Sequence, residues 1–161
     1  MRAILDKSIE WILIFLMAIM TLDVLWGVFT RYVMGSQASW SEELARFLLI
    51  WIGILGAAYA SGKHMHLAID LFPDSLPPAK RVRLMVIINL LVIAFVFAAM
   101  VVGGSRLVYV TSILGQESAA LQWPLSFIYS VMPLSGLIII YHKITDIKDQ
   151  LNAHKQSLSK S

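Results

Sequence analysis

The sequence predicts an all-α membrane protein with four transmembrane helices, and three observations lead to this fold class. Of the 161 residues, 58% are hydrophobic and only 14% are charged, whereas soluble domains carry about 25% charged residues. The mean hydropathy of +0.75 points the same way. Four apolar stretches each have about 20 residues, the length that a helix needs to cross the hydrocarbon core of a bilayer. Lipid offers no partner for an open backbone hydrogen bond, so these stretches are expected to be helices.

The predicted spans follow one another along the chain. The first span is apolar except for Asp23, and the second is preceded by a polar and acidic run. The third contains no charged residue, and the fourth begins near Pro124, because proline suits the first turn of a helix. The four spans cover about residues 11–30, 44–62, 84–105 and 121–141.

The lysine and arginine residues orient the bundle. Ten of the 13 fall in the N-terminal segment, in the connection between the second and third spans and in the tail, whereas three fall on the opposite side. Because cytoplasmic loops are enriched in positive residues, we expect both termini on the cytoplasmic side. Residues 1–161 then form a single four-helix transmembrane domain that ends in a polar cytoplasmic tail over residues 142–161.

Two connections contain apolar residues outside the predicted spans. Residues 67–72 precede a proline-rich turn, and residues 106–116 follow a complete third span. Gly103 and Gly104 allow a bend before the second of these segments. We therefore expect both segments to lie as short amphipathic pieces in the membrane interface.

Asp23 lies inside the first span, and an ionisable residue at membrane depth is a candidate functional group. Arg31 follows eight positions later, which places Asp23 about 12 Å from that end of the helix. One hypothesis gives Asp23 a role in proton or ion coupling. The alternative, which we favour, is a buried structural ion pair between Asp23 and Arg46 on the second helix.

Polar residues before the second span carry the signals of a helix start. Ser39 or Ser41 can cap the helix, and the acids at Glu42 and Glu43 suit the positive end of its dipole. Glu42 and Arg46 are spaced i, i+4, so the two side chains can form an ion pair on one face. The pattern favours a helix start that also contacts another subunit over a carboxylate site, because no nucleophile or third ligand lies nearby.

Small residues four positions apart on the second span favour close packing against another helix. Gly53 is followed by Ala57, and Gly56 by Ala60. Trp40 precedes the same span at its outer end, where tryptophan anchors a helix in the membrane interface. We interpret these positions as packing and anchoring residues.

No catalytic, cofactor or metal site is expected. The chain has no cysteine, which excludes disulfides and thiolate ligands. His64 and His66 are spaced i, i+2 and diverge on a helix, and no histidine lies in the middle of a span, where a membrane haem would need it. The sequence also lacks a phosphate-binding glycine loop, a Ser-His-Asp set and the basic stripe of a nucleic-acid-binding protein. We therefore expect neither an enzyme nor a nucleic-acid partner.

Several short motifs lie in order between residues 23 and 72, most of them near the ends of predicted helices. The motifs are Phe29-Thr-Arg-Tyr32, Trp40-Ser-Glu-Glu-Leu-Ala45, Trp51, Gly56-Ala-Ala58 and His66-Leu-Ala-Ile-Asp70. In order and spacing they resemble the small membrane subunit (the DctQ-like Q subunit) of the tripartite ATP-independent periplasmic (TRAP) transporters. The four-span layout extends the resemblance over the whole chain. One departure is the basic stretch expected before the histidine motif, which is reduced here to Lys63.

The resemblance implies a transporter of three parts in the bacterial cytoplasmic (inner) membrane. A periplasmic substrate-binding protein captures an organic acid, such as a C4-dicarboxylate, a sialic acid or a sugar acid, and docks transiently. A large membrane subunit carries the substrate and sodium sites and moves its transport domain as an elevator. The small subunit, in contact with phospholipid, binds the large one as a tight heterodimer, widens its immobile frame and helps to form the docking surface.

The resemblance also assigns roles to individual residues. Those that match the motifs are structural or subunit-interface residues rather than catalytic ones. Together with the positions argued above, the candidates are Asp23, Arg31, Trp40, Glu42, Glu43, Arg46, Trp51, Gly53, Gly56, His66 and Asp70.

Two other classes of membrane protein stay open as alternatives. A small proton-coupled multidrug exporter also has four helices and an acid in the first, here Asp23, although its connections are shorter. A membrane anchor subunit of a respiratory complex would show a haem spectrum, which the histidine positions argue against. A complete secondary transporter is not indicated, because the chain has no inverted repeat with broken helices.

Overall fold

The computed structural model describes residues 2–36, 38–63 and 78–158 of the chain. Within these residues the regular secondary structure is helical, apart from one isolated bridge between Glu117 and Pro124. Four helical segments there are long and apolar enough to cross a membrane, which confirms the predicted fold class. The orientation of the termini stays a prediction. The four segments are Ile4–Val33, Ser39–Gly62, Val82–Ile113 and Leu125–Leu151.

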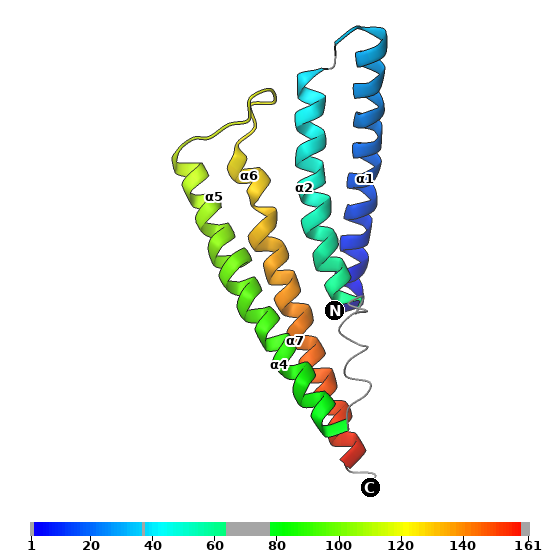
Figure 1. Ribbon diagram of the computed structural model, residues 1–161, viewed down its shortest axis with the longest axis vertical. Coiled ribbons are helices and arrows are strands. Elements are labelled where there is room, and N and C mark those ends of the chain that lie inside the picture. The colour runs from blue at the N-terminus through cyan, green and yellow to red at the C-terminus, as the bar shows by residue number, and fades with distance from the viewer. Residues whose placement is uncertain (1, 37, 64–77, 159–161) are drawn as a thin grey trace.

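The helices form two antiparallel hairpins, which contact each other mainly through α2 and α7 (Figure 1). The first hairpin pairs α1 with α2, and the second pairs the long rod of α4, the π-helix η2 and α5 with α6 and α7. The first turn of α1 and the last turns of α7 lie toward the same end of the molecule as the last turn of α2. The elements are α1 (Arg2–Val33), α2 (Ser39–Gly62), α4 (Pro78–Val96), η2 (Phe97–Gly103), α5 (Gly104–Ile113), α6 (Leu125–Tyr129) and α7 (Val131–Leu158).

The apolar core is small and lies where α2, α4 and α7 meet. Ala58, Val96 and Ile139 are buried there, one from each helix. Next to them Gly136 lets α7 approach η2 closely, because a Cβ added at this glycine would lie 3.0 Å from the Cβ of Met100. Small residues at helix contacts are the usual means of close packing in lipid, where apolar burial gives no driving force between helices.

The glycines predicted to pack against a helix do not do so among the described residues. Within residues 2–36, 38–63 and 78–158, no atom outside the local helix lies within 4 Å of a Cβ added at Gly53 or Gly56. Gly62, at the end of the same helix, instead lies against His142 of α7. The surface around Gly53 and Gly56 is therefore open to contact from another molecule.

The predicted bend at Gly103 and Gly104 is wrong. Both glycines have helical dihedral angles (φ −62°, ψ −45° and φ −63°, ψ −43°), and the rod continues through them into α5. A Cβ added at Gly104 would lie 3.0 Å from the Cβ of Met132 and 3.1 Å from the Cδ of Pro133. The glycine thus serves the approach of α7, and the segment predicted to lie along the membrane surface extends the third span instead.

The polar C-terminal region continues the last helix. The helix α7 runs through residues 142–158, beyond the predicted end of the fourth span. Within it Lys143 and Asp146 are buried, and the Nζ of Lys143 lies 3.9 Å from Oδ2 of Asp146. The first turns of the predicted tail are therefore packed structure.

Candidate functional site

Glu43 ties the second helix to the loop between α5 and α6. Its carboxylate accepts backbone N–H bonds from Ala119 at 3.0 Å and from Ala120 and Leu121 at 2.8 Å each. Hydrogen bonds to an ionised acceptor are roughly twice as strong as neutral ones. One side chain therefore attaches the loop between α5 and α6 to the first hairpin.

The loop that Glu43 holds is itself closed by short hydrogen bonds. The backbone N–H of Ser118 donates to the carbonyl of Trp123 at 2.9 Å, and the N–H of Trp123 donates to the hydroxyl of Ser118 at 3.2 Å. Gln122 has a φ of 54°, in the left-handed region that side chains rarely adopt. No residue of this loop was predicted to belong to a site, because the contact joins residues more than 70 positions apart in sequence.

The predicted ion pair between Glu42 and Arg46 is confirmed. The Nη2 of Arg46 lies 3.2 Å from Oε1 of Glu42, and both side chains are exposed. The predicted serine cap is wrong, because α2 begins at Ser39 without a side-chain cap. Ser41 lies inside the first turn, faces α1 and donates its hydroxyl to the carbonyl of Asp23 at 3.1 Å.

Asp23 is buried, but the predicted ion pair with Arg46 is not formed. The Ser41 bond places Asp23 level with the first turn of α2, and Arg46 lies five positions, or about 7.5 Å, further along that helix. Arg46 also faces outward toward Glu42. Among the described residues neither carboxylate oxygen of Asp23 has a hydrogen-bond partner.

A pocket of about 270 Å³ opens beside Asp23, between α1 and the first turns of α2. Its polar lining brings together three of the predicted site residues, although no ion pair joins Arg31 to either acid among the residues described. The polar residues that line it are Asp23, Arg31, Tyr32, Ser41 and Glu42.

Trp51 joins the two hairpins at mid-height. Its indole N–H donates to the carbonyl of Ile128 at 3.1 Å, and its ring lies 5.6 Å from the ring of Phe127. Trp40, by contrast, is exposed at the start of α2. The structure therefore gives Trp51 a role in packing within the chain and leaves Trp40 on the surface.

At the opposite end of the bundle, three helices meet on His142. The imidazole is fully buried, and its Nε2 lies 3.0 Å from Oδ1 of Asp6, within ion-pair distance but without hydrogen-bond alignment. A Cβ added at Gly62 would lie 2.7 Å from Cε1 of the same ring. No sequence signal pointed to Gly62 or Asp6 as neighbours of His142.

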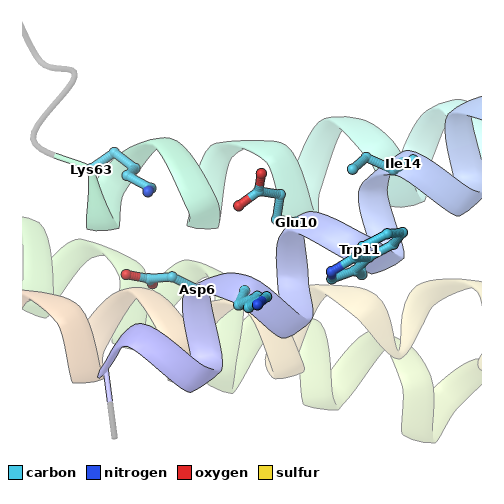
Figure 2. A pocket seen from close by; sticks show the side chains of 6 residues that line it. Asp6, Glu10, Trp11, Ile14 and Lys63 are labelled. Atoms are coloured by element: carbon cyan, nitrogen blue, oxygen red, sulfur yellow. The ribbon is translucent and has the colours of Figure 1, made fainter.

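Beside this cluster an open pocket of about 450 Å³ carries mixed charge (Figure 2). Lys63 directly follows the last residue of α2, and the other lining residues come from α1. Nearby, the hydroxyl of Tyr59 donates to Glu10 at 3.3 Å, and the Nζ of Lys63 lies 5.4 Å from the centre of the Tyr59 ring. The residues that line the pocket are Asp6, Lys7, Glu10, Trp11, Ile14 and Lys63.

Two predicted residues, His66 and Asp70, lie outside the described residues, as does His64. Over the part of the chain that the structure does describe, no group of three or more His, Cys, Asp or Glu residues is placed to hold a metal ion.

Two of the spans present most of their surface outward. In their most apolar windows only 11% of the first span and 11% of the third are buried inside the chain. On α1 the exposed face is rich in large apolar side chains. They include Trp11, Phe15, Leu22, Leu25, Trp26 and Phe29.

Comparison with known proteins gives a consistent result. Residues 20–153 match the family described as tripartite ATP-independent periplasmic transporters, DctQ component. The sialic acid TRAP transporter small permease protein SiaQ of Vibrio cholerae is 32% identical over 103 residues, 64% of this chain and 60% of that protein. The ectoine TRAP transporter small permease protein TeaB of Halomonas elongata is 29% identical over 81% of this chain and 68% of its own length. The chain thus covers less than two thirds of SiaQ.

A much longer protein also matches. The isethionate TRAP transporter permease protein DctMQ of Oleidesulfovibrio alaskensis is 29% identical over 140 residues. The matched segment is 86% of this chain but only 22% of that permease. In DctMQ, therefore, a segment similar to this chain forms one part of a far larger membrane protein.

Proposed function

Because the chain belongs to the DctQ component family of the tripartite ATP-independent periplasmic transporters, we propose that it is the small permease subunit of such a transporter. In this role it acts as an immobile scaffold for a large, sodium-coupled membrane subunit that moves the solute. The observation that carries the proposal is the exposure of two whole spans, of whose apolar windows only 11% is buried. A surface of this kind is suited to contact with other helices and with phospholipid.

The long relative supports a large partner. In DctMQ the segment similar to this chain is joined in one polypeptide to the rest of a permease. Two segments that are covalently joined in one protein are expected to lie side by side, so the separate chain is expected to bind a partner that corresponds to the remaining segment.

The contacts within the chain suit a rigid frame. Glu43 fastens the outer loop to α2, Trp51 joins α2 to α6, and His142 brings α1, α2 and α7 together at the other end. The two hairpins are thus connected at both ends and in the middle. An elevator mechanism needs one part that does not move, and these connections resist relative motion of the hairpins.

The end that carries the Glu43-bound loop is the proposed docking surface for a periplasmic substrate-binding protein. Most lysine and arginine residues lie at the other end, which the positive-inside rule places in the cytoplasm. Arg31, Trp40 and the Glu42–Arg46 pair are exposed at the proposed periplasmic end. Transient interfaces are commonly rich in aromatic and arginine residues.

The solute is proposed to be an organic acid, and sialic acid is the first to test. Relatives described as small permease proteins are named for sialic acid, C4-dicarboxylate and ectoine. Since this chain is proposed to form the frame and not the solute site, the choice of solute belongs to the large subunit and the binding protein.

Reconstitution in liposomes tests the proposal. The chain is purified alone, and also together with its proposed large permease partner, and both preparations are assayed with a periplasmic binding protein, a sodium gradient and labelled sialic acid or C4-dicarboxylate. Uptake is expected only from the complex, and the lone chain is expected to be inert. Proton-driven drug efflux by the lone chain, or a haem spectrum in the purified sample, would replace this proposal with the exporter or the respiratory anchor.

A further inference from the structure

The side chain of Asp23 is in an environment that a carboxylate rarely occupies without a partner. The residue is only 6% exposed, and neither oxygen has a hydrogen-bond partner among the described residues. Buried carboxylates are normally paired with a cation or fully hydrogen-bonded, because leaving one unsatisfied costs free energy. Asp23 is therefore expected to pair with a group that does not belong to the described residues.

The pocket beside Asp23 has room for a partner group. Its volume is about 270 Å³, several times the roughly 30 Å³ that one water molecule occupies in the liquid. Glu42 is the second acid in the lining, and its charge is already balanced by Arg46. Asp23 is then the acid whose charge an incoming group would neutralise.

Arg31 lines the same pocket but is poorly placed to fill it. It follows Asp23 by two helical turns, about 12 Å along α1. Side chains on a helix lean toward its N-terminus over the preceding turn, so Arg31 extends over Gly27 and not over Asp23 itself. No ion pair between the two residues is present.

An inorganic cation fits the pocket less well. Metal ions with a preference for oxygen take about six or more ligands. The described lining offers fewer oxygen groups than that: the carboxylate of Asp23, the carboxylate of Glu42, which is paired with Arg46, and the hydroxyls of Tyr32 and Ser41, the latter already donating to a carbonyl. A guanidinium or ammonium group brings its own hydrogen-bond donors and needs only the acceptors that Asp23 provides.

We propose that the Asp23 pocket receives one cationic side chain, a guanidinium or an ammonium group, from the large membrane subunit. This inference rests on the proposed function, since it needs that partner. In the complex the incoming cation pairs with Asp23. The free energy that the unpaired carboxylate costs in the free chain is then regained on binding, which raises the affinity. The pair also fixes how the two subunits align.

The first test compares Asp23→Asn with the wild type in two measurements. Affinity for the large subunit is measured in detergent or nanodiscs, and thermal unfolding is measured on the isolated chain. Truncating one partner of a buried charge pair weakens binding by about 30-fold or more, so a loss of this size is expected. The isolated Asp23→Asn chain is expected to unfold at the same or a higher temperature. Glu117→Gln, which removes an exposed acid from the outer loop, is the matched control and leaves both readings unchanged.

The outcomes separate the two proposals. If the wild-type chain does not bind the large subunit, the proposed function and the pocket assignment are both refuted. If the wild type binds and Asp23→Asn binds equally well, only the pocket assignment falls. A lower unfolding temperature of the isolated Asp23→Asn chain would indicate a pair within the chain, such as one with Arg31, and would overturn the inference. A sodium-dependent rise in unfolding temperature that Asp23→Asn abolishes would do the same in favour of an inorganic ion.

Crosslinking tests the identity of the occupant. The chain has no cysteine, so Ala45→Cys places a single thiol in the pocket wall. A photoreactive maleimide attached there is expected to capture a segment of the large subunit that contains lysine or arginine, and to capture at least severalfold less of it in the Asp23→Asn background. Equal capture in both backgrounds would contradict the assignment.

Discussion

Gly62 of α2 lies directly against the imidazole of His142 of α7, so closely that a Cβ at position 62 would fall 2.7 Å from Cε1 and 2.8 Å from Nδ1. His142 is fully buried and also lies beside Asp6 of α1. His142 therefore brings three helices together at the end of the bundle where α1 begins and α2 ends.

Gly62→Ala is expected to destabilise the isolated chain by about 1–3 kcal/mol, the usual cost of overpacking a close contact. Unfolding in detergent by heat or by SDS titration measures the effect. Gly53→Ala is the matched control, because nothing outside its local helix lies within 4 Å of the added Cβ and alanine has the higher helix propensity. Equal stability of the two variants would contradict the contact between Gly62 and His142.

Glu43→Ala is expected to release the outer loop. The amide hydrogens of Ala119, Ala120 and Leu121 lose their acceptor and should exchange with solvent markedly faster, as hydrogen–deuterium exchange of the purified chain can measure. Glu42→Ala, one position away, should leave these amides unchanged. Unaltered exchange in the Glu43 variant would show that other contacts hold the loop.

Arg46→Ala is expected to lower uptake by weakening assembly with the large subunit, while the isolated chain loses at most about 0.5 kcal/mol of stability. An exposed i, i+4 pair contributes only about 0.3–0.5 kcal/mol, and the pair with Glu42 is of this kind. Co-purification and uptake in liposomes measure the two effects. An intact complex in which the large subunit no longer binds solute would argue against a scaffold role.

Trp51→Phe is expected to lower the stability of the isolated chain by about 0.5–1.5 kcal/mol, because it keeps a ring beside Phe127 but removes the N–H bond to Ile128. Trp40→Phe is the control, since Trp40 is exposed. The same unfolding experiment compares them. A larger effect at Trp40 would mean that Trp51 does not join the hairpins.

The number of spans followed from the sequence because it depends on local properties. Each helix satisfies its own backbone in lipid, so length and hydropathy are sufficient to predict it. The pair between Glu42 and Arg46 followed for the same reason, since spacing on one helix determines which side chains meet. These predictions needed no information about neighbouring helices.

The predictions that failed concerned residues whose role is set by a second helix. Ser41 looked like a cap but reaches α1, and Asp23 lacks the expected Arg46 because it lies level with the first turn of α2. Gly104 looked like a hinge but allows α7 to approach. Each outcome was set by how far one helix is shifted or rotated against another.

Along each helix, then, the sequence alone determined which segments enter the membrane and which side chains share a face. Only the tertiary structure decided which glycines form contacts, which loop Glu43 holds and that Asp23 is buried beside an open pocket. The physical reason is that apolar side chains meet lipid or another helix at nearly equal free energy. Hydropathy therefore leaves the offset and rotation between helices undetermined, and close packing and a few polar bonds determine them.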